Sequence, residues 1–187
     1  MEVLLLSFPI LESERLLLID LDQTHAVHLF NQFSREDVTR YYGMDPLTTL
    51  EQAEKMIVNM NKGYSEKRSA RWGIQIKETG ELAGTIGLNN LQLWSKKCEV
   101  GYDLHPNYWG NGYVHEALEK VLSHCFETLE LSRVGAFTFP DNEASWKLLL
   151  KSGFVKEGLL RNYLYQGGEN HDAFVFSMTK EDWKAKK

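Results

Sequence analysis

The chain has 187 residues, of which 43% are apolar and 12% aromatic, so it can build a full hydrophobic core; a chain of this size buries roughly 70% of its unfolded surface. Its net charge is −5 with no long block of either sign, which argues against nucleic acid as the main ligand. No apolar run approaches the ~18 residues of a membrane span, and the acidic Glu2 is unlike the start of a signal peptide, so we expect a cytoplasmic protein without a membrane partner.

The first half of the chain predicts strands and helices in turn. Residues 14–19 read as a strand, after which Asp22 caps a helix with one apolar face. A second helix starts at Thr48 or Thr49, and Thr48 with Glu51 fits a capping box. Two strands of a hairpin follow, at residues 71–77 and 82–88.

The second half predicts a fourth strand at residues 98–104 and a long amphipathic helix. The helix is predicted from apolar residues at helical spacing: Val114, Ala117, Leu118, Val121, Leu122, Cys125 and Phe126. A fifth strand at residues 133–139 leads to a helix that starts at Asn142 and ends near Gly153. Late strands are expected at residues 154–158, 161–165 and 173–178. Cys98 and Cys125 are interpreted as buried thiols rather than a disulfide.

A turn with two glycines, Gly110 and Gly112, lies between the fourth strand and the long helix. The unpaired N–H groups and the dipole of a helix start suit a phosphate or pyrophosphate group. A P-loop would need Lys and then Ser or Thr after the last glycine, and a dinucleotide fingerprint would need glycine where His115 stands. A plain left-handed turn without a ligand is the alternative.

The segment PNYWGNGYVHEAL resembles a third kind of glycine turn, the x-x-G-x-G turn with which GNAT acyltransferases (general-control-related N-acetyltransferases) bind the pyrophosphate of coenzyme A. It departs from the family at Asn107, where Gln or Arg is usual. Further segments resemble, in order and spacing, the GNAT branch related to ribosomal-protein N-terminal acetyltransferases: Glu14-Arg15-Leu16, Glu99-Val100-Gly101-Tyr102, Asn142-Glu143-Ala144-Ser145, Ser152-Gly153-Phe154 and Glu157-Gly158.

This resemblance, which spans essentially the whole chain, implies the α/β (α+β) GNAT fold. That fold has a central, mixed, largely antiparallel twisted sheet of about seven strands, flanked by four helices and splayed between strands four and five. We expect a single GNAT N-acetyltransferase domain over residues 1–187, with a core at about 14–180, as a monomer or a homodimer.

The resemblance also implies which residues bind acetyl-CoA. Pantetheine is expected in the gap beside strand four, where the Leu104 N–H would stabilise the oxyanion of the reaction. The Asn142 amide and the Ser145 hydroxyl are expected to point toward the sulfur end. The expected coenzyme A contacts are Asp103, Leu104, His105, Trp109, Gly110, Asn111, Gly112, Tyr113, Val114, Asn142 and Ser145.

Acetyl transfer to an amine also needs a neutral amine, and the free energy of deprotonation separates two kinds of acceptor. A terminal α-amine with a pKa of roughly 7.7–8.0 costs about 1 kcal/mol to neutralise at pH 7, whereas a lysine amine near 10.4 costs nearly 5 kcal/mol. A modest base therefore suffices for an α-amine. Glu99, in the middle of strand four, is the candidate; the alternative is an ordinary charged residue on an exposed strand face.

A proton must also reach the departing thiolate. Ser145 is one candidate donor, although Asn and Ser at a helix start are also common caps. Tyr163 and Tyr165 are the other candidates, because many GNAT enzymes use a tyrosine after this helix. Tyr41 and Trp94 are expected near the acceptor amine. The histidines form no metal-binding motif, so no metal is expected.

The sequence therefore predicts an acetyl-CoA-dependent N-acetyltransferase whose acceptor is a primary amine, with a protein or peptide N-terminus as the first hypothesis. The second hypothesis keeps the reaction and moves it to a small amine such as an aminoglycoside, a polyamine or an amino acid. The third is a coenzyme A-binding module without turnover. Fold alone does not decide among the three.

Overall fold

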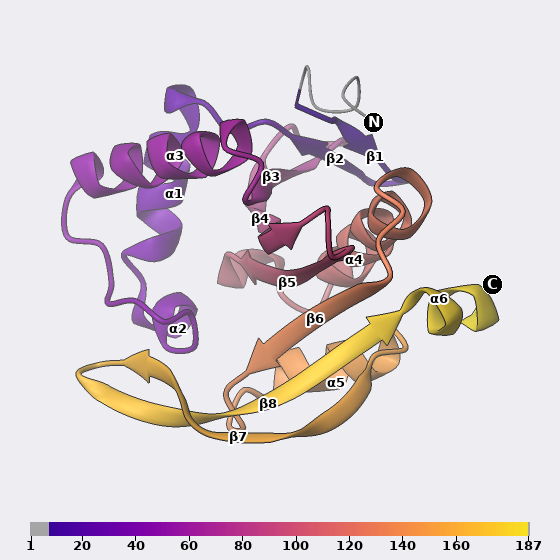
Figure 1. Ribbon diagram of the computed structural model, residues 1–187. Coiled ribbons are helices and arrows are strands. Elements are labelled where there is room, and N and C mark those ends of the chain that lie inside the picture. Colours follow the sequence, from indigo (N-terminus) through magenta and orange to yellow (C-terminus); the bar gives the residue numbers. More distant parts are fainter. Residues whose placement is uncertain (1–7, 187) are drawn as a thin grey trace.

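An eight-stranded sheet in the order β1-β2-β3-β4-β5-β6-β8-β7 organises the computed structural model, which describes residues 8–186 (Figure 1). Neighbouring strands are antiparallel except for β5 and β6, which are parallel. The strands are β1 Leu11–Glu12, β2 Leu16–Ile19, β3 Ala70–Ile76, β4 Leu82–Gln92, β5 Lys97–Leu104, β6 Arg133–Thr138, β7 Val155–Gln166 and β8 Glu169–Thr179.

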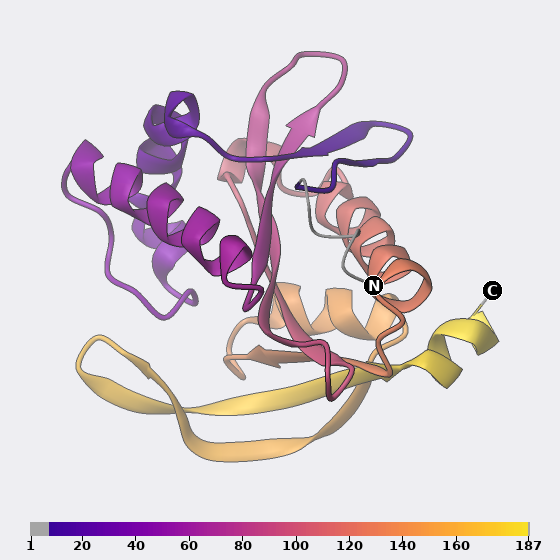
Figure 2. The same cartoon turned by 45° about the horizontal axis from the view of Figure 1, so that its top comes forward.

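Helices cover the two faces of this sheet. One face carries α1 and α3, which pack against each other, and the opposite face carries α4 and α5 (Figures 1 and 2). The helices are α1 Ala26–Phe33, α2 Glu36–Thr39, α3 Leu50–Ser65, α4 Tyr113–Ser123, α5 Glu143–Lys151 and α6 Lys180–Lys186, with 3-10 turns at Gln23–His25 and Pro106–Tyr108 and a π-helical turn at His124–Thr128. No helix in the described range is long and apolar enough to cross a membrane.

The larger core lies between the sheet and α4. It contains the apolar stripe expected for this helix, together with the fully buried Trp72 of β3. Burying a large apolar side chain contributes roughly 1.5–3 kcal/mol, so this stripe fixes α4 against the sheet. Cys98 and Cys125 are both buried and free, as the sequence predicts, and burial raises the pKa of the Cys125 thiol.

Several boundaries differ from the sequence-based expectation. The described range has eight strands and six α-helices rather than about seven and four, because β1, α2 and α6 are too short to give a periodic pattern. The two strands expected at residues 154–158 and 161–165 are one strand, β7, which begins at Val155 and whose register against β8 shifts twice. The capping box of α3 consists of Thr49 and Gln52 rather than Thr48 and Glu51.

The predicted splay lies between β5 and β6. These strands pair over three residues only, Lys97 with Arg133, Cys98 with Val134 and Glu99 with Gly135. Beyond Glu99, β5 stays paired with β4 as far as Leu104, while β6 continues with β8 to Thr138. The sheet therefore opens at Glu99, and the opening positions the candidate site.

Candidate active site

A cavity of about 390 Å³ lies where β5 and β6 separate. It brings together residues that the sequence analysis predicted from distant segments: Glu99, Tyr41, Asn142 and Ser145. Other lining residues come from β3, β4 and β6, including Arg71, Asn89 and Phe137. One space thus has access to both faces of the sheet, with the α1–α3 side at one end and the start of α5 at the other.

The glycine turn adopts the conformation that a phosphate cradle requires. Gly110 and Gly112 have φ values of 77° and 76°, in the left-handed region that favours glycine. The first intrahelical bond of α4 runs from the Glu116 N–H to the Gly112 carbonyl, so the N–H groups before Glu116 have no partner within the helix. No atom lies within 4 Å of a Cβ placed on Gly110, which leaves that side of the turn open. These features leave room for the pyrophosphate group that the sequence predicts here, and the contact itself stays a prediction.

Side chains within the turn hold this conformation. Asn111 donates its amide to the carbonyls of Tyr108 and Trp109, at 3.1 and 3.2 Å. The Trp109 indole donates to the Leu104 carbonyl at 2.8 Å, linking the turn to the end of β5. The His105 side chain accepts a hydrogen bond from the Asn107 N–H at 3.3 Å, so Asn107 stabilises the turn through its main chain. Tyr113 and Val114 then form the first turn of α4.

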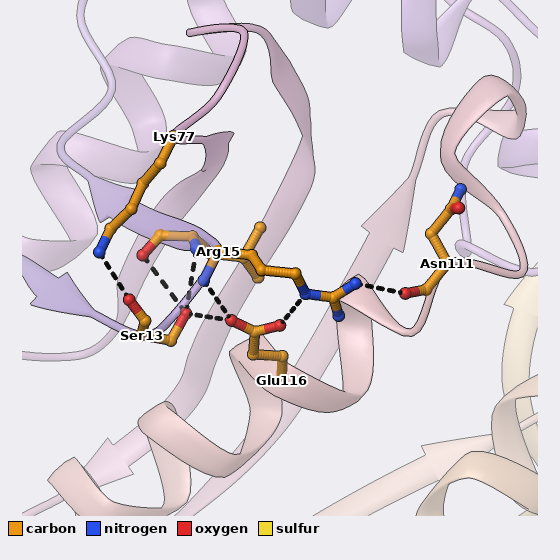
Figure 3. A network of polar contacts seen from close by, with 6 residues as sticks. Ser13, Arg15, Lys77, Asn111 and Glu116 are labelled. Carbon is orange, nitrogen blue, oxygen red and sulfur yellow. Dashed lines mark hydrogen bonds and ion pairs between the residues drawn. The ribbon is translucent and has the colours of Figure 1, made fainter.

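Arg15 links the glycine turn to α4 (Figure 3). Its Nη1 donates to the Asn111 carbonyl at 3.0 Å and its Nε to Glu116 at 2.6 Å. Glu116 also accepts from the Arg15 main-chain N–H at 2.8 Å and from the Ser13 hydroxyl at 2.7 Å. The guanidinium lies 4.8 Å from the centre of the Tyr113 ring. Sequence analysis noted Arg15 only as part of a resemblance; its contact with a helix 101 residues away carries no local signal.

The end of β5 presents main-chain groups to the gap. The His105 N–H donates to Ala83 of β4 at 2.8 Å. Because main-chain groups alternate in direction along a strand, the Leu104 N–H points away from β4, toward the side where β6 has separated. Its role as the oxyanion donor stays a prediction that this orientation allows.

The Asp103 side chain points to the face of the sheet that α1 and α3 cover. Its carboxylate accepts from the Thr85 N–H at 3.0 Å and hydroxyl at 2.6 Å, from Arg71 at 3.3 Å, and from Gln32 of α1. Burial raises the pKa of Asp103, against the lowering effect of Arg71 and the hydrogen bonds. Any contact of Asp103 with coenzyme A is therefore limited to its main chain.

Ser145 shares a hydrogen bond with Tyr102 of β5, which the sequence analysis named only within a segment that resembles the family. Their oxygens lie 3.0 Å apart, and the Tyr102 hydroxyl is 3.3 Å from the Ser145 carbonyl. Burial raises the pKa of Tyr102 to about 12, so this phenol carries its proton at neutral pH. Asn142 accepts from the Ser145 N–H at 3.2 Å and is the cap of α5. The alternation of side chains along β5 predicts that Tyr102 faces α5. It does not predict that Ser145 is the residue that Tyr102 contacts.

Glu99 lies where the sheet opens. Its carboxylate accepts from the Asn90 amide at 2.8 Å and lines the cavity. Side chains two residues apart on a strand share a face, so Glu99 and Asp103 both lie on the α1–α3 side. Tyr102 and Ser145 lie on the other side. The candidate base and the candidate proton donors therefore approach the cavity from different faces.

Of the remaining predicted residues, one lines the cavity and two do not. Tyr41 lines the cavity beside Phe139, with ring centres 5.6 Å apart. Tyr163 stacks on Phe137 at 4.8 Å but is 50% exposed and does not line the cavity. Trp94, 87% exposed in the β4–β5 turn, also does not line it.

The loop that carries Tyr41 is held by the end of β7. Gln166 donates to the Thr39 carbonyl and accepts from the Gly43 N–H, both at 2.8 Å.

Within residues 8–186, no group of three or more His, Cys, Asp and Glu side chains is arranged to hold a metal ion.

Comparisons with known proteins agree with this geometry. Residues 15–155 match the family described as Acetyltransferase (GNAT) domain. The chain is 47% identical over 173 residues to the uncharacterized N-acetyltransferase YoaA of Bacillus subtilis (strain 168), covering 92% of this chain and 98% of that protein. It is 27% identical over 125 residues to the ribosomal protein uS5-alanine N-acetyltransferase of Escherichia coli (strain K12), covering 66% and 64%.

The solved structure of spermidine N-acetyltransferase from Vibrio cholerae, in complex with CoA and spermine, aligns with a TM-score of 0.80. The alignment covers 92% of this chain and 99% of that one. At 18% identity, this likeness shows a common fold alone.

Proposed function

Because the chain belongs to the GNAT acetyltransferase family, and is therefore an acetyl-CoA-dependent N-acetyltransferase, we propose that its acceptor is the α-amine at a protein or peptide N-terminus. The observation that carries the proposal is the charge of the cavity. Among its described lining residues, Glu99 is the one carboxylate and Arg71 the one permanent cation. A polyamine or an aminoglycoside, with several positive charges, would find a single negative partner there.

A singly charged α-amine suits this cavity for a second reason. Its deprotonation at pH 7 costs only about 1 kcal/mol, which the partly exposed Glu99 can supply directly or through a water molecule. The similarity to an enzyme named for the alanine of ribosomal protein uS5 supports the same acceptor class.

Each candidate residue has a role in this proposal. The amides of the glycine turn hold the pyrophosphate, and Glu99 accepts the proton of the acceptor amine. The Leu104 N–H stabilises the negative charge that develops on the acetyl oxygen. Ser145, hydrogen-bonded to the protonated Tyr102, donates a proton to the thiolate of coenzyme A. Acetyl-CoA supplies the activated acetyl group.

The test is a mass-spectrometric screen with acetyl-CoA and a pool of acceptors. The pool holds peptides with a free N-terminus, the same peptides with a blocked N-terminus and an internal lysine, spermidine and an aminoglycoside. Acetylation confined to free N-termini is expected. Preferential acetylation of spermidine or the aminoglycoside would place the acceptor among small amines, and acetyl-CoA binding without any acetylated product would contradict turnover.

A further inference from the structure

We propose that Arg71 is the acceptor-recognition residue of this enzyme, binding the carbonyl or carboxylate oxygen attached to the carbon that bears the acceptor α-amine. This inference rests on the proposed function and specifies which part of the acceptor, besides the amine, the site recognises.

The guanidinium of Arg71 is partly buried and only partly paired. Its side chain is 10% exposed. Nη1 donates to the Thr85 hydroxyl at 2.9 Å and to Asp103 at 3.3 Å. Guanidinium carries five N–H donors, and those on Nε and Nη2 have no acceptor among residues 8–186. Arg71 lines the cavity, so these unpaired donors are available to an acceptor oxygen from outside the protein.

Two glycines let the guanidinium lie flat against the sheet. A Cβ on Gly87 of β4 would lie 3.0 Å from Nε of Arg71, and one on Gly101 of β5 would lie 3.6 Å from Nη2. These residues are direct neighbours, since Arg71 pairs with Gly87 and Gly87 with Gly101. The Arg71 side chain therefore crosses β4 and ends beside β5, the strand that carries Glu99.

The spacing between this guanidinium and the candidate base fits one amino-acid residue. Gly101 and Glu99 are two residues apart on β5 and face the same side, a separation of roughly 6.5–7 Å along the strand. An acceptor between them can place its α-amine toward Glu99 and its carbonyl oxygen toward Arg71. An amine without an adjacent oxygen provides no acceptor for the N–H groups on Nε and Nη2 of Arg71.

A second cavity, of about 470 Å³, shares Tyr42, Arg71 and Asn89 with the first. Its wall includes Met44, Met56 and Met60. Arg71 thus stands at the boundary between the space near Glu99 and a space bounded partly by flexible apolar side chains. This is the position expected of a residue that orients the acceptor rather than one that only supports the sheet.

The charges around Arg71 favour a neutral or singly negative partner. Asp103 already supplies a carboxylate on Nη1, and the nearby Tyr42 is neutral because burial raises its pKa to about 12. Gln32 and Thr85 bind Asp103 from the sides of α1 and β4. The carbonyl of a peptide and the carboxylate of a free amino acid share the required oxygen, and the experiment separates them.

The experiment compares acceptors on matched enzymes. The acceptors are an alanyl peptide, the same peptide with its first carbonyl reduced to methylene, and free alanine. The enzymes are wild type, Arg71→Gln, the double variant Arg71→Gln/Asp103→Asn, and Arg133→Gln as a control that loses an ion pair elsewhere on the sheet. Comparing two enzymes on one acceptor removes the effect of the amine pKa. The double variant removes both charges, so no buried carboxylate is left without its cation.

We expect either Arg71 variant to raise KM for the alanyl peptide by at least about tenfold, with kcat changed less than about twofold, while the reduced peptide is unaffected. A hydrogen bond to a charged group contributes roughly 1.5–3 kcal/mol, which corresponds to tenfold or more. Arg133→Gln should change neither acceptor. Preference of wild type for the peptide over free alanine identifies the carbonyl, and the reverse identifies the carboxylate.

Equal losses for the peptide and the reduced peptide in a folded Arg71 variant, or no loss for either, would overturn this inference while leaving the N-terminal acceptor in place. Failure of wild type to acetylate peptides and free alanine alike, with turnover of spermidine instead, would overturn the proposed function and this inference together. If Arg71→Gln unfolds, the double variant is compared with wild type on the same acceptors instead.

Discussion

The carboxylate of Glu116 on α4 binds Arg15, the residue just before β2, twice: through Nε at 2.6 Å and through the main-chain N–H at 2.8 Å. The same guanidinium reaches the carbonyl of Asn111 inside the glycine turn. Strand, turn and helix are thereby joined at one ion pair. Asn107 lacks the long polar side chain that is usual at its position, so the positive charge at this turn comes from a residue far away in the sequence.

We predict that Glu116→Gln weakens acetyl-CoA binding by about three- to tenfold, because the glycine turn loses the partner that holds Arg15 in place. The effect is moderate since the Arg15 side chain is 46% exposed and its ion pair is screened by solvent. Glu119→Gln is the control: it removes an ion pair with Lys186 from the same helix. Calorimetry giving the same Kd for both variants would contradict an anchoring role for Glu116.

Gly112→Val should weaken acetyl-CoA binding at least tenfold, about 1.4 kcal/mol, because a branched side chain would block the approach of the pyrophosphate. The matched control is Gly80→Val, since Gly80 has a similar φ of 72° in the hairpin turn before β4. Both substitutions carry the strain of a left-handed residue, roughly 1–2 kcal/mol, but only the first lies at the cradle. Unchanged affinity in folded Gly112→Val would remove the turn from the binding site.

Ser145→Ala should lower kcat by about 10²-fold or more, with little change in the Kd of acetyl-CoA, if the Ser145 hydroxyl donates a proton to the thiolate. Tyr102→Phe should reduce kcat in the same way, because the two hydroxyls share a hydrogen bond. Groups that act as one unit give non-additive losses, so the double variant should be hardly slower than the slower single variant. A lower melting temperature with intact kcat per folded molecule would mean that Ser145 only stabilises the start of α5, and Tyr163 or Tyr165 would then be examined.

Glu99→Gln keeps size and hydrogen bonding but removes the charge, so kcat/KM should fall roughly 10²-fold near pH 7. Part of the loss should return at high pH, where solvent has already deprotonated the acceptor. An α-amine acceptor should recover by about pH 8–9, and a lysine acceptor only near pH 10 or above. Glu78→Gln in the β3–β4 turn is a control for loss of a carboxylate. Superimposable profiles for wild type and Glu99→Gln across about pH 6–9 would exclude Glu99 as the base.

Acid should destabilise the fold partly through Glu157. Hydrogen bonds from Arg133 and Ser177 lower its pKa from 4.5 to about 2. A depressed pKa stabilises the folded protein above the unfolded value, and this contribution is lost as pH falls from 4.5 toward 2. The free energy of unfolding of wild type, measured with urea, should therefore fall more between about pH 6 and pH 3 than that of Glu157→Gln. Equal pH dependence of the two proteins would show that the ion pair contributes nothing to folding.

Local patterns in the sequence predicted the parts of the site that depend on local structure. The stripe on α4 needs only helical spacing, and the turn needs only glycine at 110 and 112 followed by a helix start, so both could be located. The ends of helices were harder to predict where two neighbouring residues can both act as the cap. Thr48 and Thr49 can each cap α3, and the structure uses the second with Gln52.

Pairs that form across the sheet could not be predicted in this way. Tyr102 meets Ser145 across 43 positions, and Arg71 meets Asp103 across 32. Both contacts follow from the strand order and the register of β3, β4 and β5, which hydrophobic alternation does not determine. Asp103 shows the result: its place beside Leu104 suggested the cofactor, but the alternation of β5 turns its carboxylate to the other face.

From the short pairing of β5 with β6 we expect bound acetyl-CoA to stabilise the folded protein against degradation. Beyond Glu99, no strand among residues 8–186 pairs with β5 on the β6 side, so a bound pantetheine would fill the missing position in the sheet. A ligand at 100 times its Kd stabilises a fold by about 2.7 kcal/mol. Amide hydrogen exchange between residues 100 and 104 should then slow on binding, and resistance to proteolysis should rise with the supply of acetyl-CoA. The enzyme would be most durable in a cell rich in its acetyl donor, and would be cleared faster when that donor runs short.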